Sequence, residues 1–182
     1  MDAEDLAIIR LAQCGDRPAF ARLVERYWPM LNRLALSMVG DLDAEDCAQE
    51  AFVIAWRKLP GLRAPEAMVA WLIRITVRLC IRRSRYCRLL RPLSALRFHP
   101  EFPEQDPSAV IDVEWMLMKL APRQRAVMHL TVIEGMSDSE IAVALHITAA
   151  SVRSHRRRAK EALQKWIAVP VLTPKGELYE PE

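Results

Sequence analysis

The 182-residue sequence is poor in glycine, with only five such residues, and shows little of the alternation that is typical of β-strands. Alanine, leucine, arginine and glutamate are abundant instead, and these residues favour α-helices. Hydrophobic residues make up 52% of the chain and charged residues 27%, a composition that supports a folded core and excludes a disordered polyelectrolyte. The sequence therefore predicts an all-α fold, as one ordinary domain or two small ones.

Long apolar runs and an apolar leader are also missing. No run approaches the length needed to cross a bilayer, and the acidic start "MDAEDLAIIR" lacks the apolar centre of a signal peptide. We therefore expect no membrane insertion and a cytoplasmic location.

Patterns of metal binding and catalysis are lacking as well. The four cysteines, Cys14, Cys47, Cys80 and Cys87, form no C-x-x-C motif. Cys80 and Cys87 would lie roughly 10 Å apart along one helix, too far for one metal ion to bridge. We interpret the thiols as reduced and structural rather than as redox or metal sensors. None of the four histidines has a nucleophile and an acid near it in a catalytic pattern, and there is no glycine-rich loop that could bind phosphate. We therefore expect that the protein is not an enzyme and binds no cofactor.

Proline divides the chain into parts. Residues 4–91 are helix-like except for a loop over residues 60–68, and residues 110–168 are helix-like again. Four prolines in residues 92–109 prevent helix propagation and predict an extended, flexible linker. The tail, residues 169–182, is also rich in proline and is expected to be loose. The prediction is thus two small helical domains joined by a linker.

The stretch "SDSEIAVALHITAASVRSHRRRAKEAL" begins as one helix, stops, and restarts as a second helix that is rich in arginine. Ser137 and Glu140 have the spacing of a capping box, so the first helix begins there. This helix ends at His146, and the Thr148 side chain can cap the next one. Two short helices joined by a three-residue turn, of which the second is basic, predict a helix-turn-helix.

A helix-turn-helix places its second helix in the major groove, where arginine can pair with guanine edges. The expected base contacts are Arg153, Ser154, Arg157 and Arg158. The expected contacts with the DNA backbone are Arg123, Arg125, Thr148 and Lys160. An amphipathic helical hairpin with a solvated basic face is the alternative. Arg156 conflicts with this division of the helix into a basic face and a buried face. It is charged, but its spacing from Val152 places it on the side expected to be buried.

A second basic zone lies in "WLIRITVRLCIRRSRYCRLLR", which contains no acidic residue. The arginines Arg74, Arg78, Arg82 and Arg85 step by three and four, so they share one helix face. A helix face that only contacts solvent normally carries glutamate for i,i+4 pairing, and this stretch has none. We therefore favour nucleic-acid binding over an ordinary solvent-exposed face.

The stretch "GDLDAEDCAQE" is acidic and contains no base. Carboxylates at a helix start stabilise the helix dipole, which is one explanation for them. Asp46, Gln49 and Glu50 lie one turn further along, and carboxylates there would repel DNA and attract a basic protein partner. The sequence leaves dipole stabilisation and partner docking equally open.

Four motifs resemble one known family. They are "QCGDRPAFARLVERYWPML", "DAEDCAQEAFVIAW", "LAPRQRAV" and "GMSDSEIAVAL". In this order they resemble the bacterial sigma factors of the extracytoplasmic-function (ECF) type, within the sigma-70 family, over nearly all of residues 4–167. The resemblance implies a transcription factor that brings promoter recognition and strand opening to RNA polymerase and has no chemistry of its own.

The resemblance also implies roles for each part. Residues 4–91 would be the sigma-2 domain, whose acidic cluster docks on the β′ clamp helices of core RNA polymerase. The arginine stripe would hold DNA at the −10 element, and the loop from Gly61 to Ala67 would capture an unstacked base. Residues 110–168 would be the sigma-4 domain, which binds the −35 element and the β flap. Such factors are usually inhibited by an anti-sigma factor, which is a further expected partner.

The chain departs from the family pattern in places. Arg78 and Arg82 replace a frequent asparagine and aspartate, so the base preferences at the −10 element are in doubt. His146 replaces a turn glycine and would be strained if its φ is positive, and Arg156 replaces a frequent leucine. Two alternatives remain: a LuxR-like regulator that binds operator DNA without polymerase, and a helical adaptor with no DNA role.

Overall fold

The computed structural model describes residues 3–90 and 117–167, and every regular element in these ranges is helical. The elements are α1 (Ala3–Gln13), α2 (Arg17–Val39), α3 (Asp41–Lys58), the 3₁₀ turns η1 (Leu59–Gly61) and η2 (Pro65–Ala67), α4 (Met68–Leu90), α6 (Pro122–Val132), α7 (Asp138–Leu145) and α8 (Ala149–Ile167). The prediction of an all-α fold is confirmed. The predicted linker and tail lie outside the described residues, and the domain boundaries stay a prediction.

Local sequence signals explain where the first long helices begin and end. The Asp16 carboxylate caps α2, since its Oδ1 accepts a hydrogen bond from the Ala19 amide at 2.8 Å. Gly40 separates α2 from α3 at a φ of 79°, in the region that glycine enters without strain. Its amide still donates to the Leu36 carbonyl at 2.9 Å, which closes the last turn of α2. These boundaries agree with those expected from the sequence.

Helices α1 to α4 bury one apolar stripe each against a common core. The stripe of α2 includes Leu23, Leu31 and Leu34, which step by three to eight residues and are almost fully buried. On α4, Leu72 and Ile73 are fully buried and meet this stripe. Most basic and acidic positions of these helices are left at the surface, whereas Asp5 of α1 is buried and pairs with Arg26 of α2.

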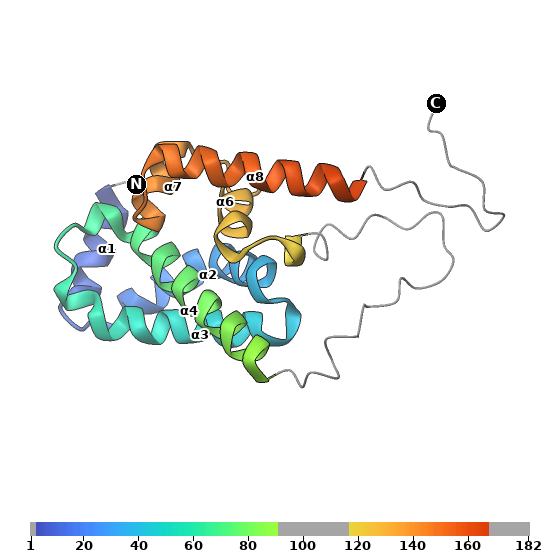
Figure 1. The fold of residues 1–182 in the computed structure, drawn as a ribbon. Helices are drawn as coiled ribbons and strands as arrows, with labels where there is room; N and C mark the ends of the chain where they lie inside the picture. The colour runs from blue at the N-terminus through green and yellow to red at the C-terminus, as the bar shows by residue number, and fades with distance from the viewer. Residues whose placement is uncertain (1–2, 91–116, 168–182) are drawn as a thin grey trace, which may run out of the picture.

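The two halves of the described chain pack on each other, which the sequence did not predict. Helix α7 lies against α4 and α6 lies against α2, and α8 runs across the same side of the molecule (Figure 1). One continuous core includes Leu34 and Leu72 of the first half and Leu130 and Ile141 of the second. An ion pair between Arg33 and Glu134, at 3.1 Å, also joins the halves.

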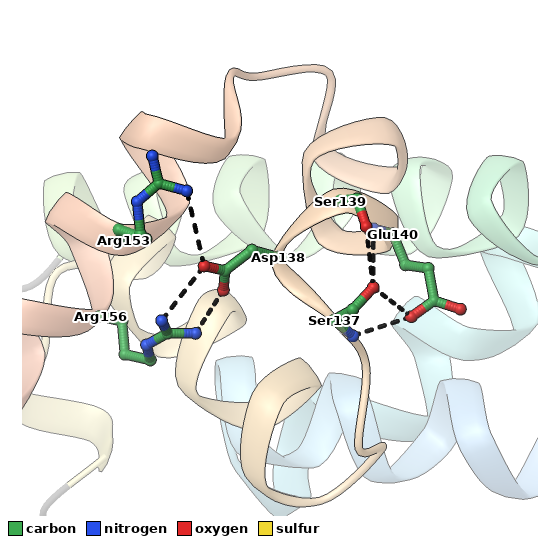
Figure 2. Close-up of polar contacts among 6 residues, drawn as sticks. All are labelled: Ser137, Asp138, Ser139, Glu140, Arg153 and Arg156. Atoms are coloured by element: carbon green, nitrogen blue, oxygen red, sulfur yellow. Dashed lines mark hydrogen bonds and ion pairs between the residues drawn. The ribbon is translucent and has the colours of Figure 1, made fainter.

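The helix-turn-helix is present as predicted, with α7 and α8 joined by a three-residue turn. Its capping box is complete: the Ser137 Oγ accepts from the Glu140 amide, and the Ser137 amide donates to the Glu140 carboxylate at 2.8 Å (Figure 2). Thr148 caps α8, since its Oγ1 accepts from the Ser151 amide at 3.1 Å. His146 ends α7 in the left-handed region, with a φ of 55°.

The left-handed conformation of His146 gives a stability prediction. A side chain with a Cβ is strained there by about 1 kcal/mol, and the exposed imidazole contributes few contacts. We expect His146→Gly to raise the free energy of unfolding by roughly 0.5 kcal/mol, since the greater freedom of glycine in the unfolded chain offsets part of the gain. Urea denaturation measures the change. His146→Ala, which keeps a Cβ, should bring no such gain, and a loss of stability in His146→Gly would contradict the strain.

Candidate nucleic-acid interface and docking surface

Helix α8 presents most of the predicted base contacts to solvent. Arg153, Arg157 and Arg158 are exposed, whereas Ser154 is half-buried. Lys160, predicted to contact the DNA backbone, is exposed on the same helix. A shallow hollow at the surface is lined by Arg153, Arg156, Arg157, Lys160, Glu161 and Gln164. Val152 and Ala159 are buried and hold the opposite face of α8 against the rest of the protein.

Carboxylates orient part of this basic face. Arg156 forms a bidentate salt bridge with Asp138, the first residue of α7 (Figure 2). The Arg156 Nη2 lies 3.2 Å from the Asp138 Oδ2. Arg153 lies near the same carboxylate, at 3.9 Å. The position of Arg156 is thereby explained: it is half-buried and ties α8 to α7. Arg157 pairs with Glu161 one turn along α8, at 2.8 Å.

The predicted backbone contacts outside α8 differ in exposure. Arg123 is exposed in the first turn of α6. Burial lowers the pKa of His155, and the nearby charges of Arg123 and Arg158 lower it further. Arg123 therefore extends the basic surface of α8. Thr148 is exposed, and its hydroxyl is engaged in the cap of α8.

The prediction that Arg125 contacts DNA phosphates is wrong for this structure, because the side chain is only 4% exposed. Its guanidinium donates hydrogen bonds to the backbone carbonyls of Met38, Leu117, Met118 and Leu120. Arg125 is thus a structural residue that joins α6 to the end of α2. These partners could not be predicted from spacing, since Met38 precedes Arg125 by 87 residues.

The arginine stripe on α4 is exposed at Arg78, Arg82 and Arg85, as its spacing predicts. Arg74 differs, because it is half-buried and points toward the end of α7. Its Nε donates to the Ala144 carbonyl at 3.1 Å, and its Nη2 donates to the Val143 carbonyl. In this arrangement Arg74 satisfies the last carbonyls of α7 and is not presented to a ligand.

The acidic cluster lies on the exposed side of α3. Asp46, Gln49 and Glu50 are all exposed, while the opposite side of α3 packs into the core. Glu50 pairs with Arg82 at 2.6 Å, so the acidic cluster and the arginine stripe meet at one edge, which the sequence did not predict. Both side chains remain at least half exposed, and such pairs contribute about 0–1 kcal/mol, so a partner can displace this one.

The loop from Gly61 to Ala67 leads into α4; it begins at the last residue of η1 and contains η2. Gln13 of α1 anchors it, since its Nε2 donates to the carbonyls of Leu59 and Leu62 at 3.2 and 2.7 Å. Arg63 at its centre is exposed. The anchored first part of the loop leaves Arg63 and, further along, Glu66 exposed before α4 begins.

In residues 3–90 and 117–167, no three histidine, cysteine, aspartate or glutamate side chains gather as a metal ion would need. Over the same ranges, no helix combines the length and the apolar character required to span a bilayer.

The chain matches two family models and several curated relatives. Residues 23–88 match Sigma-70 region 2, and residues 112–163 match Sigma-70, region 4. The chain is 30% identical to the ECF RNA polymerase sigma factor SigM of Mycobacterium tuberculosis, over 90% of this chain and 85% of that protein. It is also 30% identical to the RNA polymerase sigma-H factor of Pseudomonas aeruginosa, over 89% and 93% of the two chains.

A solved structure is similar over nearly its whole length. CnrH in complex with the cytosolic domain of CnrY superposes with a TM-score of 0.68 and 28% identity, over 90% of this chain and 96% of that one. The CnrH protein of Cupriavidus metallidurans is also among the relatives that match in sequence, at 30% identity. The match therefore includes both halves of the chain.

Proposed function

Because the chain belongs to the ECF sigma factors of the sigma-70 family, we propose that its exposed charged surfaces divide the work of transcription initiation among them. The acidic cluster docks on the β′ clamp helices of core RNA polymerase, α8 recognises the −35 promoter element, and α4 with its preceding loop holds the −10 element. The protein acts in the cytoplasm and has no catalytic activity of its own.

The observation that carries this proposal is the presentation of α8. A complete capping box, a three-residue turn and the pair between Arg156 and Asp138 hold this helix rigidly, with Arg153, Arg157 and Arg158 exposed. Rigid placement matters because arginine recognises guanine through two parallel hydrogen bonds.

At the −10 element, the proposal rests on Arg78, Arg82 and Arg85 and on the loop from Gly61 to Ala67. The three exposed arginines lie along one helix face and can follow a phosphate backbone. The anchored loop beside them, with the exposed Arg63, suits the capture of an unstacked base of the opened strand.

The packed arrangement of the two halves fits a factor that is not engaged with a promoter. Arg74 is bound to α7, and α7 covers part of α4, so a contact of Arg74 with DNA requires the halves to separate. CnrH adopts a similar fold in complex with the cytosolic domain of CnrY. We propose that an anti-sigma factor likewise binds this chain and covers its DNA-binding and polymerase-binding surfaces. Purification of the native complex from cells tests this, and recovery with polymerase subunits alone would count against it.

Run-off transcription with purified bacterial core RNA polymerase and a promoter library is the direct experiment. We expect initiation at a subset of promoters that share −35 and −10 sequences, only when the chain is present. A folded protein that supports no initiation from any promoter would contradict the proposal. A LuxR-like regulator would instead bind duplex DNA without polymerase, and a helical adaptor would show no salt-dependent DNA binding.

The recognition helix gives a quantitative prediction. Arg158 is exposed and, among the described residues, forms no ion pair, so it is available for a base edge or a phosphate. With a promoter obtained from the run-off assay, we expect Arg158→Ala to weaken holoenzyme binding by about 1–3 kcal/mol. Competition binding at several salt concentrations measures the loss. If Arg158 contacts a phosphate, the salt slope falls by about one.

Lys165→Ala is the matched control for this change. Lys165 is an exposed cation on the same helix, two turns beyond Arg158 and outside the predicted contact residues. Its loss should leave promoter affinity nearly unchanged. Equal losses in the two variants would mean that α8 attracts DNA through diffuse charge and does not recognise the −35 element through Arg158.

A further inference from the structure

Two cysteines from different helices meet in the interface between α3 and α4. Cys47 of α3 is 4% exposed and Cys80 of α4 is fully buried, and the two side chains lie in one core cluster, close enough for each thiol to shift the pKa of the other. Both thiols are free in the structure. The spacing of the cysteines along the chain did not predict this pair, because it is formed by packing between helices.

Solvent reaches the pair from one side. A surface hollow of about 180 Å³ is lined in part by Cys47, Glu50, Arg82 and Arg83. A water molecule occupies about 30 Å³ of liquid, so a small peroxide fits the hollow beside the Cys47 sulfur. Cys80 lies behind Cys47 and does not line it.

The two thiols differ in acidity, as an attacking and a resolving cysteine do. The neighbouring Cys80 side chain lowers the pKa of Cys47, and the nearby Arg83 lowers it as well, against the opposing effects of burial and of Asp43 and Glu50. The same interaction and deeper burial raise the pKa of Cys80 far above its usual range. Thiolate character therefore concentrates on the sulfur that borders the hollow.

We propose that Cys47 and Cys80 form a peroxide-sensitive thiol pair, whose oxidation to a disulfide ties α3 to α4 beneath the acidic cluster. The Cys47 thiolate attacks one oxygen of a hydroperoxide, the O–O bond breaks, and the other oxygen leaves as an alcohol or water after taking a proton. The resulting Cys47 sulfenic acid is attacked by the Cys80 sulfur. The S–S bond forms as the hydroxyl group leaves with the Cys80 proton as water. The peroxide is reduced by two electrons, and the two thiols are oxidised by two.

The disulfide has a mechanical consequence, which rests on the proposed docking role of the acidic cluster. Glu50 lies one turn beyond Cys47, and Arg83 lies one turn beyond Cys80. Arg83 already pairs with Asp43 at 2.7 Å and lies 3.7 Å from Asp46. A covalent link of about 2.05 Å between the sulfurs holds these partners together, so the carboxylates are less free to meet a basic protein. Oxidation should therefore weaken polymerase docking.

Thiol mapping of the full chain tests the disulfide without any polymerase. The variant with both Cys14→Ala and Cys87→Ala retains only the proposed pair, and circular dichroism confirms that it folds. After treatment with hydrogen peroxide and alkylation of the unfolded chain in guanidinium, we expect both thiols to resist alkylation together, a mass lower by two hydrogens, and a peptide that links Cys47 to Cys80. Reduction should restore both thiols.

Two variants assign the roles of the cysteines. In Cys80→Ala, Cys47 should stop at the sulfenic acid and react with dimedone, whereas in Cys47→Ala the thiol of Cys80 should resist peroxide. In the wild-type chain, Cys14 is exposed and provides the internal comparison. If Cys47 and Cys80 stay alkylatable while Cys14 is oxidised, the proposal is overturned.

Binding to core polymerase tests the consequence separately. In the background that lacks Cys14 and Cys87, we expect a several-fold lower affinity after oxidation, recovered on reduction. Equal affinity of the reduced protein and the mapped disulfide form would overturn the coupling to docking. A reduced protein that does not bind polymerase at all would contradict the proposed function, and the thiol mapping would still decide whether the pair is oxidised.

Discussion

Glu50→Arg should lose more than tenfold in affinity for core RNA polymerase while remaining folded. Glu50 is exposed on α3, so its replacement buries no charge and the folding cost is small. At the proposed interface the new guanidinium would face a basic partner surface, and disruption of such a charge pair costs about 2 kcal/mol or more. Competition of labelled wild-type protein for core polymerase measures the affinity, and circular dichroism verifies the fold.

The ion pair between Glu50 and Arg82 requires its own control, because Glu50→Arg also removes this pair. The double variant Glu50→Arg with Arg82→Glu restores an internal pair of opposite orientation and should still bind polymerase poorly. Glu25→Arg reverses an exposed carboxylate on α2 that is not part of the acidic cluster, and this variant should bind normally. Recovery of binding in the double variant would show that the internal pair, and not a negative surface, matters for docking.

Arg125→Ala should destabilise the protein by roughly 3 kcal/mol or more. The substitution leaves four backbone carbonyls without the charged donor that now satisfies them, in a place that water hardly reaches. Hydrogen bonds to charged groups contribute about 1.5–3 kcal/mol each, and a buried acceptor left unpaired adds to the loss. Urea denaturation of the full chain measures the change in the free energy of unfolding.

Arg123→Ala is the control for Arg125→Ala, because Arg123 lies two residues earlier on α6 and is exposed. Its loss should change stability by no more than about 0.5 kcal/mol. Arg125→Lys keeps the charge but has a single donor group, so its stability should fall between wild type and Arg125→Ala. Equal stability of Arg123→Ala and Arg125→Ala would mean that the carbonyl contacts do not hold α6 in place.

Features that depend on neighbouring residues were predictable from the sequence. The cap at Ser137, the stop at Gly40 and the turn at His146 arise from side chains within four residues of each boundary. Exposure of the arginine stripe also followed from spacing, since one helix period places Arg78, Arg82 and Arg85 on one face. The family motifs then connected these local features to a function that the comparisons confirm.

Features that depend on distant partners were not predictable. In the sequence, Arg125 is indistinguishable from an arginine that contacts phosphate. Its burial and its hydrogen bond to the Met38 carbonyl become apparent only in the folded structure. Arg156 was a misfit until Asp138, 18 residues earlier, was seen to pair with it. The neighbours of a long side chain are set by the packing of helices, which a single sequence does not specify.

One continuous core runs from α2 and α4 into α6 and α7. A measurement of heat capacity can therefore show whether the two halves are packed together. Parting the two halves would hydrate the apolar side chains at their junction, and apolar hydration raises heat capacity. Calorimetry of the closed protein should show a single melting peak, because neither half completes its interior alone. If a partner separates the halves and leaves this junction exposed to water, the heat-capacity change of its binding should be more positive than for a partner that leaves the halves together.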